Sequence, residues 1–175
     1  TPDFIPAFPT FKNELKSDYN TSYQSFEKAH KNIEENPDLA VGLANSTLES
    51  IIKHILDDER LILKASSSDT LYKLASNILK EFSMFPQGRN SEMPEEINKI
   101  GSALLNVSKN IEKLRSTKTN LHGKTKEDYV LNDSLYAYFV VNSITTVGMF
   151  LKSFYETKFK IISSSANNEP DDLPF

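Results

Sequence analysis

The chain has 175 residues and a net charge of −4, with 38% hydrophobic and 25% charged residues, a balance typical of a globular domain and not of a disordered chain. It contains no cysteine, which excludes disulfides and thiolate metal sites and suits a reducing, cytoplasmic location. We find no secretory signal and no uninterrupted apolar run of membrane-spanning length, so we expect no membrane partner.

Prolines and phenylalanines are interleaved over residues 1–19, and this pattern predicts an extended N-terminal arm whose rings pack onto the rest of the protein. A helical domain is expected over residues 20–160. Its helices are predicted at about 21–35, 37–58, 70–85, 94–117 and 132–160, with a polar segment before the last one. Because no strand pattern is present, the sequence predicts an all-α, five-helix bundle.

The second predicted helix has an apolar face with an acidic residue at its edge. Glu49 lies at the boundary of that face, and Lys53 follows it by four residues. On spacing alone, we favour a surface ion pair between the two. The other interpretation is that they support a functional site. The apolar face itself consists of Ala44, Leu48, Ile51, Ile52 and Ile55.

The fourth predicted helix contains an arginine in line with its apolar residues. Arg115 continues, at helical spacing, the row Ile97, Ile100, Leu104, Val107 and Ile111. A guanidinium in this position keeps its proton and needs an anion, an acceptor or solvent. His122 follows seven residues later, and Gly123 permits a tight reversal there. The pair can therefore meet at one end of the bundle. A structural arginine and a surface histidine are the alternative.

Positive charge is concentrated around this pair, although the chain as a whole is acidic. Between residues 109 and 126, six basic residues face the single acidic residue Glu112. A local basic patch of this kind can attract a phosphate backbone, and a solvated, lysine-rich helix end is the other interpretation. The basic residues are Lys109, Lys113, Arg115, Lys118, Lys124 and Lys126.

The fifth predicted helix carries two adjoining apolar rows, too wide for a helix with a single neighbour. We expect it to be either the central helix of the bundle or half of a dimer interface. One row is Leu135, Phe139, Val147 and Phe150, and the other is Tyr136, Val140, Ile144, Leu151 and Tyr155.

Two segments in this order resemble a known family. LANSTLESIIKHIL, residues 43–56, resembles the early signature helix of the abortive-infection (Abi-C type) C-terminal domain, and Leu114-Arg115-Ser116 followed by Leu121-His122-Gly123 resembles its later motif. The likeness extends over about residues 36–159. That family is similar to the HEPN superfamily of compact, commonly dimeric helical bundles, many of which are metal-independent ribonucleases in phage defence or toxin–antitoxin systems.

The resemblance implies a site and a chemistry. Arg115 and His122 would be catalytic, and RNA would be cleaved to 2′,3′-cyclic phosphate ends without a metal or other cofactor. Ser116 stands where the family more often has asparagine or aspartate. The alternative is a non-catalytic dimerisation or RNA-binding module. The remaining implied residues are the supporting Ser116, Gly123, Glu49 and Lys53 and the RNA-binding Lys113, Lys118, Lys124 and Lys126.

The last fifteen residues, 161–175, are predicted to be a flexible acidic tail, because a serine- and asparagine-rich linker precedes an acidic end. That end resembles the tip of bacterial single-stranded DNA-binding proteins. We therefore expect it to dock onto replication or repair proteins that read such tips, through its aromatic ring, chain-end carboxylate and aspartates. The residues concerned are Asp171, Asp172, Leu173, Pro174 and Phe175.

Overall fold

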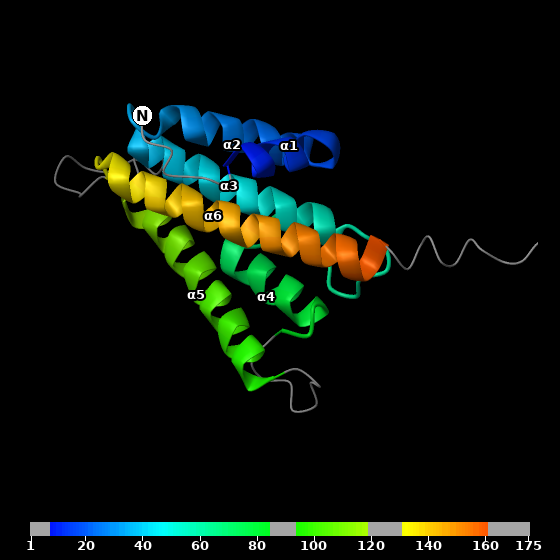
Figure 1. Cartoon of the computed structure of the whole chain (residues 1–175). Coiled ribbons are helices and arrows are strands. Elements are labelled where there is room, and N and C mark those ends of the chain that lie inside the picture. The colour runs from blue at the N-terminus through cyan, green and yellow to red at the C-terminus, as the bar shows by residue number, and fades with distance from the viewer. Residues whose placement is uncertain (1–7, 85–93, 119–130, 161–175) are drawn as a thin grey trace, which may run out of the picture.

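The structure is a computed structural model that describes residues 8–84, 94–118 and 131–160. Within these ranges it contains helices and no strand, so the predicted all-α class is confirmed. The elements are α1 (Phe8–Asp18), α2 (Asn20–Asn32), α3 (Pro37–Leu56), α4 (Leu71–Glu81), α5 (Glu95–Lys118), α6 (Ser134–Tyr155) and a short π-helix, η2 (Glu156–Lys160) (Figure 1). Helices α2 to α6 lie close to the five that were predicted.

The prediction of an extended arm over residues 1–19 is wrong for Phe8–Asp18, which form α1. Pro9 falls in the first turn of this helix, where the missing amide hydrogen is not needed. Phe11 and Leu15, four residues apart, are both fully buried, and the Phe11 ring packs edge-on against Phe26 at 4.8 Å. The expected packing of an N-terminal ring onto the domain is therefore correct, but the ring belongs to a helix and not to an extended arm.

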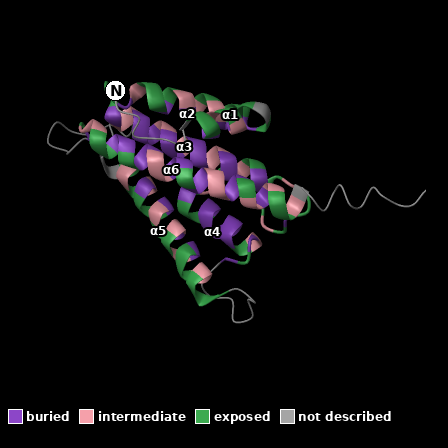
Figure 2. Cartoon of the chain, viewed as in Figure 1, coloured by how far each residue is buried: buried purple, intermediate pink, exposed green. Residues whose placement is uncertain are grey.

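Helix α3 lies at the centre of the bundle and packs against α2, α4, α5 and α6 (Figure 2). It begins at Pro37, whose fixed backbone angle suits the first turn. Twelve of its twenty residues are buried, and they lie on more than one side of the helix. A helix that is apolar around most of its circumference must be covered on every such side. The four neighbours of α3 provide that cover.

The central helix of the bundle is α3 and not α6, which packs mainly against α3, and the alternative of a dimer interface on α6 stays a prediction. Ile144, Leu151 and Tyr155 are buried in the bundle, whereas Leu135 and Phe139 near its start are 59% and 71% exposed. The helix begins at Asp133, whose carboxylate accepts a hydrogen bond from the Leu135 amide. By length and hydropathy alone, 134–159 is a candidate membrane span, a test that buried core helices also pass, and half of its apolar 18-residue window is buried here.

The buried side of α5 follows the apolar row that the sequence predicts only at Ile111. Gly101 and Ser108 are buried against α3 and α4, whereas Ile100 in the predicted row is 54% exposed. The cause is close packing, because a Cβ atom at Gly101 would collide with the carbonyl oxygen of Met84. Small side chains allow this side of α5 to approach its neighbours most closely. Most of the predicted row, namely Ile97, Ile100, Leu104 and Val107, instead lines cavities between α5 and α6.

A polar network fixes the end of α6 to the loop after α3. The Asp58 carboxylate accepts hydrogen bonds from the Arg60 guanidinium and, at 2.6 Å, from the Tyr155 hydroxyl. Arg60 also donates to the carbonyl oxygen of Phe159 in η2. The hydrogen bonds from Arg60, together with the one from Tyr155, hold the pKa of the Asp58 carboxyl well below its usual range. The network therefore fixes the position of η2 against the loop after α3.

Substitution of Gly101 tests the close packing of α5. Gly101→Ala should lower the free energy of unfolding by about 1–3 kcal/mol, because the new Cβ meets backbone and not a flexible side chain. This loss should appear although alanine gains roughly 1 kcal/mol in helix propensity. Urea unfolding measures it, with Ser102→Ala, at a half-buried neighbouring position, expected within about 0.5 kcal/mol of the wild type. A Gly101→Ala protein as stable as that control would contradict the packing.

The Asp58 network predicts a pH-dependent stability. A carboxyl whose pKa is lower in the folded than in the unfolded chain stabilises the fold above its unfolded pKa, about 3.9, and this contribution is lost as the pH falls further. Asp58→Asn should therefore be less stable than the wild type at pH 7, and the difference should shrink below about pH 4. Thermal unfolding from pH 3 to pH 8 measures both proteins. Asp57→Asn, at an exposed carboxylate outside the network, should show no such convergence.

Candidate functional site

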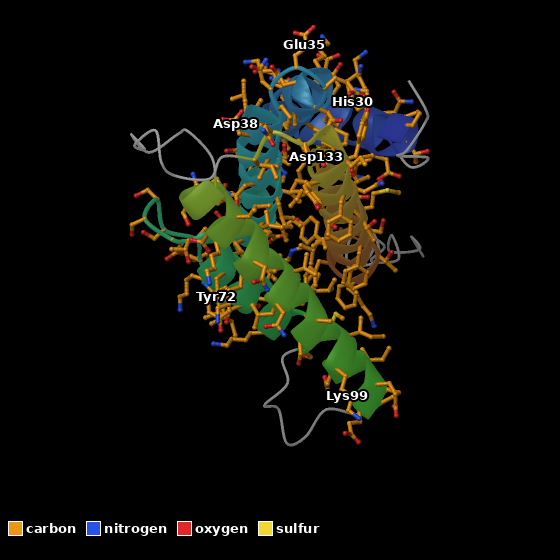
Figure 3. The ribbon with its side chains drawn as sticks, turned by 90° about the vertical axis from the view of Figure 1, so that its left-hand side faces the viewer. His30, Glu35, Asp38, Tyr72, Lys99 and Asp133 are labelled. Atoms are coloured by element: carbon orange, nitrogen blue, oxygen red, sulfur yellow. The ribbon has the colours of Figure 1, made fainter. Side chains whose placement is uncertain are left out.

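Arg115 lies on the last turns of α5, where the buried side of that helix ends. Ile111, one turn earlier on the same row, is buried, whereas Arg115 is half-buried with its Nε atom enclosed by protein. Seen from the side in Figure 3, this end of α5 lies across α3, and Lys99 marks the opposite end. The helix therefore holds a permanent positive charge at the border between core and solvent.

The other charged and polar residues of this end lie around Arg115 on α5. Ser116 donates its hydroxyl to the Lys113 carbonyl at 3.0 Å, so it binds the backbone of its own helix. Lys113 is exposed. The Lys109 ammonium lies 5.9 Å from the centre of the Tyr72 ring, and Glu112 accepts a hydrogen bond from the Tyr72 amide. Part of the basic stretch thus also joins α5 to the start of α4, where Figure 3 labels Tyr72.

Several predicted site residues lie outside the described residues. His122, Gly123, Lys124 and Lys126 belong to this group, as do the five residues of the tail tip, Asp171 to Phe175, and the side chain of Lys118. The meeting of Arg115 with His122 and the docking of the tail onto other proteins therefore stay predictions.

Glu49 lies on α3, half-buried, and accepts a hydrogen bond of 2.6 Å from the Nδ2 atom of the fully buried Asn45. Among the described residues, Glu49 and Lys53 do not form the ion pair that their spacing suggests. Lys53 instead borders a separate polar cavity of about 370 Å³, together with His54 and Asp57 near the end of α3. The two supporting residues thus belong to different surroundings.

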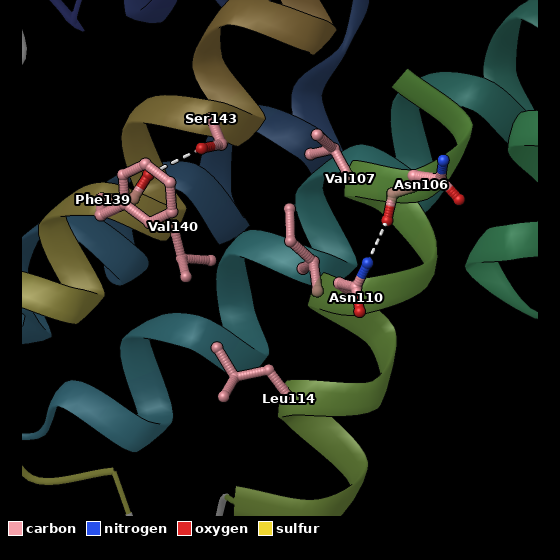
Figure 4. A pocket seen from close by; sticks show the side chains of 8 residues that line it. Asn106, Val107, Asn110, Leu114, Phe139, Val140 and Ser143 are labelled. Carbon is pink, nitrogen blue, oxygen red and sulfur yellow. Dashed lines mark hydrogen bonds between the residues drawn. The ribbon is translucent and has the colours of Figure 1, made fainter. Parts of the chain in front are cut away.

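An apolar cavity of about 290 Å³ lies between α5 and α6, and its wall includes Leu114, the residue before Arg115. Figure 4 shows its walls, with Leu114 and Val107 on α5 opposite Phe139 and Val140 on α6. Two further residues, Asn106 and Asn110, border this cavity on the exposed side of α5 and were not predicted from the sequence. Their spacing of four residues next to an apolar row was the available signal, but such a pattern is common on solvated helix faces.

A hydrogen bond to the loop after α2 holds the start of α6. The Tyr138 hydroxyl donates to the Glu34 carboxylate at 2.8 Å. Burial, together with this hydrogen bond, raises the pKa of Tyr138 to about 12, so the hydroxyl keeps its proton near neutral pH. Leu135, one turn before Tyr138, and Phe139, the residue after it, are exposed.

The described residues contain no group of three or more histidine, aspartate or glutamate side chains that could hold a metal ion. The groups that the described part of the site offers are the half-buried guanidinium of Arg115, the lysines Lys109 and Lys113 on the same helix, and the apolar cavity between α5 and α6. These groups can bind an anionic ligand that also has an apolar part.

In a comparison with protein-family models, residues 20–155 match the family Abi_C, described as a HEPN-like domain. The matched region includes Glu49, Arg115 and His122. No curated protein and no solved structure matches the chain significantly.

Proposed function

The chain belongs to the Abi_C family of HEPN-like domains, and on this premise we propose that it is a metal-independent endoribonuclease that acts in phage defence, by abortive infection, or as a toxin. The observation that carries the proposal is the position of Arg115, half-buried at the end of α5 within a basic stretch and directly after Leu114 of the cavity wall. We assign the activity to the cytoplasm, where RNA substrates are present.

RNA carries its own nucleophile, so a base and a charge stabiliser at one phosphate are sufficient for cleavage. His122 would accept the proton of the 2′-hydroxyl, whose oxygen then forms a bond to phosphorus while the bond to the 5′-oxygen breaks. The departing 5′-oxygen takes up a proton, which leaves 5′-hydroxyl and 2′,3′-cyclic phosphate ends. Arg115 would stabilise the charge that develops on the phosphoryl oxygens.

The basic residues around the pair would attract the RNA backbone. Lys113 is exposed on α5, two residues before Arg115, and Lys118 is the last residue of this helix. Together with Lys124 and Lys126 they would raise the local concentration of RNA on a chain whose net charge is negative. Binding should therefore weaken as the salt concentration rises.

We also propose that the protein is a homodimer and that the first turns of α6 form its interface. Leu135, Tyr136 and Phe139 are 59%, 56% and 71% exposed, an apolar cluster that is unusual on the surface of a monomer. Phe139 shares the cavity between α5 and α6 with Leu114, the neighbour of Arg115. A symmetric pairing through this surface would bring two Arg115 side chains towards one shared cleft.

The catalytic proposal predicts the loss of RNA cleavage in two variants. His122→Ala should lower the cleavage rate at least about 100-fold, because a proton-transfer group is removed, and Arg115→Ala should be similarly impaired. Arg115→Lys should remain well below the wild type, because a lysine cannot bind phosphate with two parallel hydrogen bonds. End-labelled RNA in the presence of a chelator measures the rates and the product ends.

His30→Ala is the control, because His30 is exposed on α2 and belongs to no proposed site. It should cleave like the wild type. Unchanged cleavage by His122→Ala would end the catalytic proposal. Binding of RNA without any cleavage by the wild type would instead favour the non-catalytic RNA-binding or dimerisation module.

The dimer proposal predicts a change in mass. The wild type should elute with twice the 19.8 kDa of one chain in size-exclusion chromatography with light scattering. Phe139→Asp should shift it to the monomer, because a carboxylate in an apolar interface is strongly unfavourable. Ile62→Asp is the control, since Ile62 is 87% exposed on the loop between α3 and α4. A monomeric wild type, or a dimer that survives Phe139→Asp, would refute this interface.

A further inference from the structure

A second apolar groove lies between the first half of α5 and the last half of α6, away from Arg115. Its cavity measures about 460 Å³. Among the described residues that line it, Thr146 is the one with a polar side chain, and its hydroxyl donates to the Asn142 carbonyl of its own helix. The apolar lining residues are Met84, Ile97, Ile100, Leu104, Phe150 and Phe154.

This lining selects an apolar occupant. A polar group inside the groove would exchange its hydrogen bonds to water for contacts with aliphatic and aromatic walls, which is unfavourable. Ile100 is 54% exposed, so part of the apolar surface faces solvent when the groove is empty. Apolar surface of this kind marks a place where another segment or another protein packs.

The last described residues of the chain lie next to this groove. The ring of Phe82 stacks on Phe154 of the groove wall, with centroids 4.3 Å apart, and also on Phe159, at 5.9 Å. Arg60 holds the carbonyl group of Phe159. The last turn before the tail is therefore fixed against the same aromatic cluster that forms one wall of the groove.

The length and composition of the tail match the groove. Fifteen residues follow Lys160, and their last apolar side chains are Leu173 and Phe175. Along the helix axis, the ten steps from Phe150 to Lys160 span roughly 15 Å. A flexible chain of about twelve residues has a root-mean-square length of roughly 20 Å, so it reaches the groove without being stretched. A linker whose root-mean-square length matches the distance it must span gives the highest effective concentration of the tethered segment at its binding site.

We propose that Leu173 and Phe175 bind in this groove of the same chain. The two apolar side chains enter the cavity, and Asp171 and Asp172 stay at its rim in contact with water. A second copy of the chain is the less suitable occupant, because the exposed cluster at the start of α6 is a separate surface and the tail is already tethered beside the groove. The proposal does not depend on ribonuclease activity.

The absence of cysteine allows a direct test by disulfide formation in the full chain. One cysteine replaces Asp172, next to the apolar pair, and a second replaces Ala103, which is exposed on α5 between Ile100 and Leu104. Under mild oxidation, this double variant should form a disulfide within one chain. We expect it to form at least about tenfold faster than in a control with cysteines at positions 172 and 62, because docking holds the tip at the groove.

Ile62 makes the control stringent. It is 87% exposed and lies two residues from Arg60, which binds Phe159, so a tail that does not dock would reach it at least as easily as Ala103. Adding Phe175→Ser should lower the rate at Ala103 to that of the control. Equal rates at both positions would overturn the proposal. A disulfide between two chains, seen as a band of doubled mass, would also overturn it and assign the groove to a second copy. Neither result would bear on RNA cleavage.

Discussion

The need to cover α3 determines the arrangement of the bundle. Its buried residues lie on several sides of the helix, so it is stable only when surrounded by other helices. Helices α2, α4, α5 and α6 share this work, and α1 contributes by burying Phe11 beneath α6, where a Cβ at Gly148 would lie only 2.7 Å from the Phe11 ring. The exposed cluster on α6 and the two grooves lie where they do because the opposite sides of α5 and α6 are occupied in covering α3.

Helix α5 shows how this demand creates a site. Its small residues Gly101 and Ser108 face inwards together with Leu105 and Ile111 and allow close packing, whereas other apolar residues of the helix are only partly covered, namely Ile97, Ile100, Leu104 and Val107. They face α6 across two cavities, one at each end of the pair of helices. Arg115 extends the apolar row to the end where α5 meets solvent. A guanidinium tolerates this border because its flat apolar faces pack on protein while its edges bind anions or water.

The sequence predicted the helices well because their boundaries carry local signals, such as Pro37 at the start of α3 and the break before Thr70, which caps α4 by accepting from the Lys73 amide. It failed at α1, because proline in a first turn looks like proline in an extended arm. The sequence also predicted the wrong buried side for most of α5. A hydrophobic pattern favours large apolar residues for the buried side and does not indicate that a glycine, Gly101, can be the point of closest packing. The position of Arg115 on α5 was predictable from spacing, whereas the hydrogen bond from Asn45 to Glu49 depends on burial that spacing does not reveal.

The two cavities between α5 and α6 have similar linings but different neighbours, and this difference separates their roles. The cavity near the start of α6 is lined by the exposed ring of Phe139 and by Leu114, which lies between Lys113 and Arg115 in the sequence. A ligand there meets positive charge and apolar surface together. The cavity near the end of α6 adjoins the stacked rings of Phe82 and Phe154 and the anchored η2. The two cavities share no lining residue, because one uses the first turns of α6 with the second half of α5 and the other uses the last turns of α6 with the first half of α5. The proposed dimer formation and the proposed tail docking therefore use different residues of one molecule.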